Sequence, residues 1–263
     1  MRALRHICAT CFLLLALSFA SAQTKPRVVH VFVALADNQH QGIVWVSTAL
    51  GNGEDPARNL YWGAAFGVKT FFHNSTDWKE VLRVQEPHKA VLERIVFQHR
   101  TQNVVLVADA YRGSEIKQAL TDFFQTAAGA NLYAGEPKAC TIGGVVWCPP
   151  EGADLAVYVG HDGLMDFPLS LEFPNPSSTN RSAIVLACAS KSYFKDLLRK
   201  TGAQPLLWTT GLMAPEAYTL KAALDGWILE ESKEQIRRRA AEAYSKYQKC
   251  SLSAAQRLFS NSW

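Results

Sequence analysis

Short, nearly uninterrupted runs of apolar residues recur along the chain and set its hydrophobic pattern. Five of them cover residues 28–35, 103–108, 155–160, 182–186 and 205–209. Runs of this length that do not alternate with polar residues and are rich in β-branched side chains are typical of strands buried on both faces of a parallel sheet. Residues 78–84 give a weaker strand pattern, and residues 43–50 fit either a short strand or an extended loop.

Segments with apolar residues at helical spacing lie between these runs. They predict helices over residues 56–68, 88–100, 114–124, 193–200 and 216–229. Strands that alternate with helices in this way form right-handed βαβ units. The pattern therefore predicts an α/β fold, a three-layer α/β/α sandwich around a mainly parallel sheet of about six strands.

The first 22 residues have the pattern of a secretory signal peptide. Arg2 and Arg5 precede an apolar centre at residues 12–17, and Ala20-Ser21-Ala22 is a small-residue cleavage site. We expect cleavage after Ala22 and a secreted or periplasmic protein. No later stretch is long and apolar enough to predict a membrane span.

The rest of the chain divides at about residue 230. Residues 23–230 carry the alternating pattern of the α/β domain, and the charged residues 231–263 predict a solvated helical tail. The formal net charge is only +4, which argues against nucleic acid as a main partner. The sequence leaves the oligomeric state open.

Four cysteines follow the predicted signal peptide, and an exported protein normally pairs its cysteines. Cys140 and Cys148 flank a segment short enough to close as a loop, so we expect a disulfide between them. Cys250 is an alternative partner for either. Cys188 is either a free thiol or the partner of Cys250.

Two of the predicted strands end in residues that carry chemistry. The run at 155–160 is followed by His161, and the run at 182–186 by Ala187-Cys188. Because parallel strands present their carboxyl ends at one edge of the sheet, His161 and Cys188 are expected to meet there as base and nucleophile. The alternatives are a buried core cysteine and a histidine that bonds Asp162 or a backbone carbonyl.

These two blocks resemble the caspase–legumain–gingipain superfamily of cysteine peptidases, in which one strand ends in His-Gly and a second in Ala-Cys. Asp162 stands between His161 and Gly163 here, and His161 and Cys188 are 27 residues apart, which is short for the family. The resemblance implies a caspase-like sheet, a His161–Cys188 dyad, and an oxyanion hole formed by the backbone N–H groups of Gly163 and Cys188.

Four further residues are candidates for substrate binding. Asp37 and Asn38 follow the first predicted strand and Thr210 follows the last, so all three lie at the same predicted edge. Asp162 is expected either to orient His161 or, together with Asp166, to favour a basic side chain at the cleavage site. The alternative for each of these residues is a solvated loop.

Several other classes of site have no support in the sequence. It lacks a Gly-x-Ser-x-Gly elbow, a Gly-rich phosphate loop, Cys-x-x-Cys spacing and EF-hand spacing, so we expect neither a cofactor nor a metal. The favoured hypothesis is an exported cysteine peptidase that acts on a peptide or protein substrate. The first alternative is a catalytically silent α/β domain that binds a peptide or glycan, and the second is a structural domain with Cys188 in a disulfide.

Overall fold

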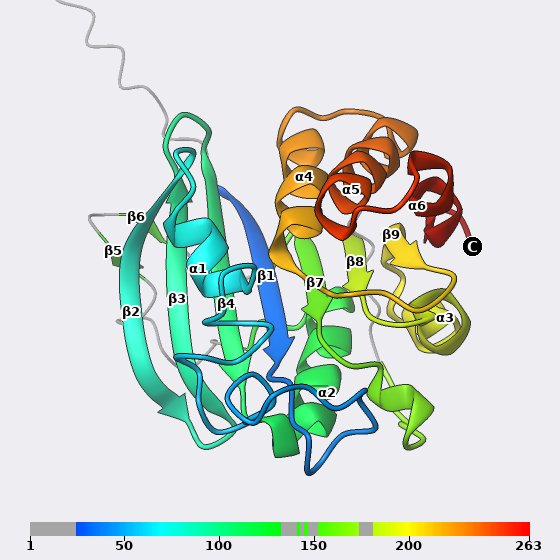
Figure 1. Ribbon diagram of the computed structural model, residues 1–263. Helices are drawn as coiled ribbons and strands as arrows, with labels where there is room; N and C mark the ends of the chain where they lie inside the picture. Colours follow the sequence, from blue (N-terminus) through cyan, green and yellow to red (C-terminus); the bar gives the residue numbers. More distant parts are fainter. Residues whose placement is uncertain (1–24, 133–140, 143–144, 147–151, 174–180) are drawn as a thin grey trace, which may run out of the picture.

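The fold is an α/β structure built on one eight-stranded mixed sheet. The computed structural model describes residues 25–132, 141–142, 145–146, 152–173 and 181–263. The strand order is β10-β9-β8-β7-β1-β4-β3-β2 (Figure 1). Neighbouring strands from β9 through β8, β7 and β1 to β4 are parallel, whereas β2, β3 and β10 pair antiparallel with their neighbours. The sheet is therefore mostly but not wholly parallel.

The strands of this sheet are β1 Arg27–Ala34, β2 Trp78–His88, β3 Val91–His99, β4 Val104–Tyr111, β7 Leu155–Val159, β8 Ser182–Leu186, β9 Gln204–Thr209 and β10 Phe259–Ser260. A separate pair is formed by β5 Thr141–Ile142 and β6 Val145–Val146. The helices are α1 Val68–His73, α2 Ile116–Ala127, α3 Ser190–Thr201, α4 Ala217–Ile228, α5 Lys233–Gln248 and α6 Leu252–Leu258, with short 3₁₀ turns η1 Gly113–Glu115 and η2 Gly163–Met165. None of the helices in the described ranges is long and apolar enough to cross a membrane.

Side chains on the central strands alternate between two buried clusters, one on each face of the sheet. In β7, Leu155, Val157 and Val159 belong to the cluster that includes residues of α1, α4 and α5. Ala156 and Tyr158 belong to the other cluster, with residues of α2 and α3. Because both faces are covered, these strands consist mainly of apolar residues without regular polar alternation, which is why the sequence identified β1, β4, β7, β8 and β9.

The helix predicted over residues 88–100 is wrong, because this segment is strand β3. It pairs antiparallel with β2 and with β4. Val91, Leu92, Ile95 and Val96 fit helical spacing, but the same β-branched residues also suit a strand that is buried on both faces. The weaker strand pattern at residues 78–84 is confirmed as part of β2, and the additional strands β3 and β10 bring the sheet to eight rather than about six.

The helix predicted over residues 56–68 is also wrong, because the segment forms a series of turns and α1 begins only at Val68. The Asn59 side chain accepts a hydrogen bond from Ala36 N–H at 3.0 Å and donates to Ala36 O at 2.8 Å. An asparagine that bonds distant backbone in this way competes with helical hydrogen bonds. A side chain at Gly63 would also lie 2.1 Å from Ala57 O.

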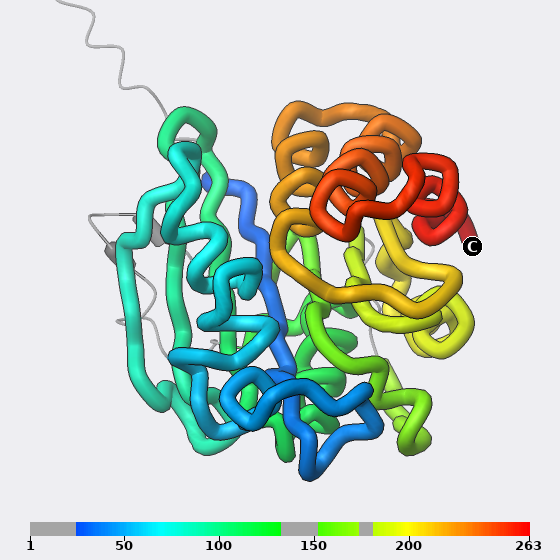
Figure 2. Tube along the Cα trace, in the orientation of Figure 1, coloured from blue at the N-terminus to red at the C-terminus, as the bar shows by residue number. Residues whose placement is uncertain are grey.

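The segment after residue 230 is helical as expected, but it is not a solvated tail. Ile236, Ala240, Ala241 and Tyr244 of α5 are buried in the cluster that covers one face of the sheet. Beyond α6, strand β10 pairs with β9 at the edge of the sheet. In Figure 2 this last segment runs beside the chain that leaves β9.

Candidate functional site

The candidate site lies where the order of the sheet reverses direction. Strand β4 lies on one side of β1, whereas β7, β8 and β9, which come later in the chain, lie on its other side. Ligands of open α/β sheets bind outside the carboxyl ends of the strands at such a switch point. Val159 of β7 is paired with Leu186 of β8, and His161 and Cys188 each follow two residues later. The two candidate residues therefore leave adjacent strands at equivalent positions.

His161 and Cys188 line the same cavity, which has a volume of about 330 Å³. The chain segments that follow four parallel strands form its walls. They contribute Val44 and Val46 after β1, His161 and Met165 after β7, Cys188 after β8, and Leu212 and Met213 after β9. The structure thus places the candidate nucleophile and base at one opening, together with residues from both halves of the sheet.

Cys188 sits in a tight turn that joins β8 to α3. Ala189 has a φ of 47°, a left-handed conformation that costs an L-residue roughly 1–2 kcal/mol. The buried hydroxyl groups of Ser190 and Thr209 hold this turn: Ser190 Oγ donates to Val185 O at 3.1 Å, and Thr209 Oγ1 donates to Ala187 O. Helix α3 begins at Ser190, earlier than predicted, so its positive N-terminal end lies directly after Cys188.

The Cys188 thiol is free, as is that of Cys250, the other cysteine in the described ranges. In this structure the two are therefore not joined. The thiol donates to Met213 O at 3.6 Å, and Met213 N–H points at the sulfur at 3.4 Å. The Met213 backbone can thus hydrogen-bond Cys188 in either protonation state, because its carbonyl accepts from a thiol and its N–H donates to a thiolate.

A carboxylate fixes the orientation of the His161 ring. Nε2 of this nearly buried histidine lies 2.7 Å from Asp166 Oδ2. The same oxygen accepts the N–H of Gly42 at 3.0 Å. A side chain at Gly42 would lie 2.5 Å from Asp166 Oδ1, so glycine permits this close approach of the loop after β1. The histidine partner considered from the sequence was Asp162, but the structure shows Asp166 instead.

Asp162 is fully buried, and Asp166, not Asp162, bonds the His161 ring. Asp162 Oδ1 accepts the N–H of Leu164 at 3.0 Å as the N-cap of η2, whereas Oδ2 has no hydrogen-bond partner among the described residues. Burial raises the pKa of the Asp162 carboxyl to about 7, and the nearby charge of Asp166 adds to this effect. A carboxyl group in this position does not bind a substrate side chain.

The structure does not bring Gly163 to the cavity as an oxyanion donor. Its N–H donates to His161 O at 3.1 Å. A side chain there would meet Phe167, Ile116 and Leu120 at 2.9–3.1 Å, so this glycine allows η2 to pack onto α2.

The other three candidate substrate-binding residues hold loops together. Asp37 accepts the N–H of Gln39 at 2.8 Å and bonds the ring of His40 at 2.9 Å. Asn38 bridges its loop through two hydrogen bonds with the Val46 backbone. Thr210 donates to Arg257 O and Leu258 O. None of the three is among the described residues that line the cavity.

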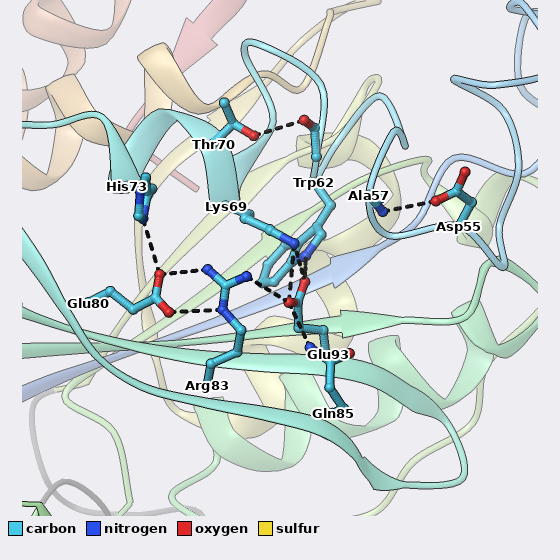
Figure 3. A network of polar contacts seen from close by, with 11 residues as sticks. Asp55, Ala57, Trp62, Lys69, Thr70, His73, Glu80, Arg83, Gln85 and Glu93 are labelled. Atoms are coloured by element: carbon cyan, nitrogen blue, oxygen red, sulfur yellow. Dashed lines mark hydrogen bonds and ion pairs between the residues drawn. The ribbon is translucent and has the colours of Figure 1, made fainter.

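Tyr61 and Glu216 also line the cavity, although the sequence did not make either a candidate site residue. Burial raises the pKa of Tyr61, and the nearby Cys188 and Glu216 raise it further. The next residue, Trp62, donates to the buried Glu93 of β3 at 2.6 Å, and Lys69 bonds the same carboxylate at 2.9 Å (Figure 3). This network anchors the irregular segment that presents Tyr61 to Cys188, and no sequence motif indicates it.

Within the described residues, no group of three or more His, Cys, Asp or Glu side chains is placed to hold a metal. Cys140 and Cys148, the expected disulfide, lie outside the described residues.

We find no match to this chain among protein-family models, curated proteins or solved structures.

Proposed function

We propose that this protein is an exported cysteine peptidase in which Cys188 is the nucleophile and His161 the general base. The observation that carries the proposal is that both residues follow adjacent parallel strands at equivalent positions and line one cavity. A thiol nucleophile requires a nearby base, and the sheet register supports the pairing by bringing the two residues to neighbouring strand ends. The proposal also includes a three-layer, caspase-like arrangement of the domain.

In the proposed reaction, the proton of the Cys188 thiol passes to His161 and the sulfur attacks the carbonyl carbon of the scissile peptide bond. His161 then gives the proton to the leaving amine as the C–N bond breaks. Water, activated by the same histidine, hydrolyses the thioester and releases the thiol. Asp166 is the positioning residue, because it holds Nε2 of the ring.

Two features support negative charge on the reacting sulfur. The twelve-residue helix α3 begins two residues after Cys188, and helix N-termini stabilise anions. Met213 N–H donates to the sulfur directly. Since Gly163 N–H is used inside its own turn, the proposed oxyanion donors no longer include it.

A catalytically silent binding domain is the second candidate. The observation in its favour is that Gly163 N–H bonds His161 O inside its own turn. The oxyanion hole implied by the resemblance to the caspase–legumain–gingipain superfamily, which uses two N–H donors, then lacks one of them. The two candidates differ in one measurable property: only the peptidase turns over peptide bonds through Cys188.

The test uses the protein without residues 1–22, incubated with a peptide library and separately with iodoacetamide. We expect cleavage that is abolished in Cys188→Ala and strongly reduced in His161→Ala. The matched control is Cys250→Ala, which removes the other free thiol in the described part of the chain, also of intermediate exposure, and should leave cleavage intact.

Alkylation of the wild type should map to Cys188, with a rate that falls when His161 is replaced. Absence of any cleavage by the wild type would overturn the peptidase and leave the binding domain. Cleavage that persists in Cys188→Ala would overturn the nucleophile.

A further inference from the structure

The rim of the cavity beside Cys188 carries apolar side chains that are unusually exposed. Val44 is 88% exposed, Leu212 76% and Met165 43%, and all three line the cavity. They come from three separate segments, after β1, after β9 and in η2. Single exposed apolar residues are ordinary on a protein surface, but a cluster around a concave opening marks a binding site.

The interior of the cavity is also mainly apolar. Ile43, Leu60, Met213 and Pro215 line it together with the rim residues. A volume of about 330 Å³ is at the small end of the range of about 300–1,000 Å³ that is typical of ligand sites. This size suits one large side chain and the adjoining backbone rather than an extended ligand.

The described lining residues include a single carboxylate, and neighbouring side chains already bond one of its oxygens. Glu216 is the acidic residue in this set, and its Oε2 already accepts Tyr218 Oη at 2.7 Å and Gln248 Nε2 at 3.0 Å. Asp166 holds His161, and Asp162 is buried under η2. The two aspartates that were expected to favour a basic substrate side chain, Asp162 and Asp166, are therefore not among the described residues that line the cavity.

We propose that this cavity is a specificity pocket for a large apolar side chain, so that the substrate is a peptide with a leucine-like or methionine-like residue next to the scissile bond. This inference rests on the proposed function, since it names the substrate class of the same site. A charged side chain placed here would lose its hydration among mainly apolar walls, with Glu216 as the one acidic residue of the described lining set, whereas an apolar one covers Val44, Met165 and Leu212.

The experiment compares peptidyl chloromethyl ketones Ala-Ala-X, in which X is Leu, Met, Ala, Lys or Asp. The Cys188 sulfur displaces chloride and forms a thioether, so the labelling rate reports how well X fits. Tandem mass spectrometry on tryptic digests identifies the labelled residue. We expect the Leu and Met probes to label Cys188 about 10–200-fold faster than the Ala probe, and the Lys and Asp probes to be slower than Ala.

Rim variants sharpen the test, because exposed positions tolerate substitution without unfolding. In Leu212→Asp and Val44→Asp, the ratio of the Leu-probe rate to the iodoacetamide rate should fall at least about tenfold. The matched control is Leu229→Asp, an apolar residue 59% exposed at the end of α4, in which the ratio should not change.

The failures of the two proposals are distinguishable. Labelling of Cys188 that is fastest with Lys or Asp, or equal for all five probes, overturns the apolar pocket and leaves the nucleophile standing. Failure of every probe to label Cys188 overturns the proposed function and this inference with it. A ratio that falls equally in Leu229→Asp would also overturn the assigned location of the pocket.

Discussion

Two buried carboxyl groups in this molecule have opposite surroundings. Glu93, on β3, accepts hydrogen bonds from Trp62, Lys69 and Gln85 (Figure 3). Burial alone would raise its pKa, but these hydrogen bonds outweigh burial and hold the pKa of Glu93 below the ordinary value. Asp162, beside the candidate site, has one backbone donor and an oxygen without a partner among the described residues, and its pKa is raised to about 7.

The difference separates a part of the fold in which buried charges are paired from the part in which we propose that the chemistry takes place. Around Glu93 every charge is paired, and the network fixes α1 and the turns before it to the sheet. Around Cys188 and His161 the structure keeps a left-handed alanine, an underbonded carboxyl and exposed apolar side chains. Such unfavourable features persist when surrounding structure holds them, and they cluster at functional sites.

The largest effect is expected from removing Glu93, the carboxylate whose hydrogen bonds are satisfied. Glu93→Ala leaves Trp62 Nε1 buried without an acceptor and Lys69 without its partner, so we expect the free energy of unfolding to fall by roughly 3–5 kcal/mol. Urea denaturation measures it. The control is Glu172→Ala, since the Glu172 side chain is 86% exposed and its loss should cost little. A change below about 1 kcal/mol for Glu93→Ala would show that the network is not structural.

An intermediate effect is expected from replacing the buried carboxyl group of Asp162 by an amide. Because its folded pKa lies above the usual 3.8, the folded state holds the proton more tightly, and stability is lost as the pH rises from 3.8 to about 7. Asp162→Asn keeps the acceptor for Leu164 N–H and removes the buried charge. It should stabilise the protein by roughly 1–3 kcal/mol at pH 8 and by little at pH 4.

Denaturation at both pH values, with the exposed Asp196→Asn as the control, measures this effect. Destabilisation at pH 8 in Asp162→Asn would contradict the assignment of a strained, protonatable carboxyl group.

The smallest effect is expected at the turn after Cys188. Glycine adopts a φ of 47° without the penalty that alanine pays, although it also loses more backbone freedom on folding. Ala189→Gly should therefore raise the melting temperature slightly, corresponding to about 0.5–1 kcal/mol. The control, Ala128→Gly at the end of α2 where φ is −76°, should lower it. Equal losses in the two variants would mean that residue 189 is not strained.

The sequence predicted the parts of the fold that depend on continuous apolar runs. Strands β1, β4, β7, β8 and β9 were identified because both of their faces are buried, and their shared edge followed from parallel pairing. The strand β3 was missed because Glu93 and Arg94 interrupt its apolar pattern, and their partners Lys69 and Asp109 are distant in sequence. Local periodicity contains no information about such pairs.

The candidate site was predictable to a similar degree. His161 and Cys188 stand at the ends of recognisable strands, so their convergence on one cavity followed from topology. Asp37, Asn38 and Thr210 lie at the expected edge, but their side chains bond their own loops or the last segment of the chain. Tyr61 and Glu216 were not identified, because an irregular segment and the start of α4 deliver them to the cavity without any motif.

The short strand β10 has a consequence for how this protein is handled in experiments. Phe259 and Ser260 pair with Thr209 and Trp208, so they cap the open hydrogen-bonding edge of β9. Removing them would leave that edge free to pair with another molecule, which is a route to aggregation. The loop that carries Leu212 starts at Thr210, whose hydroxyl donates to Leu258 O. A purification tag that pulls β10 away would therefore threaten solubility and the shape of the cavity together.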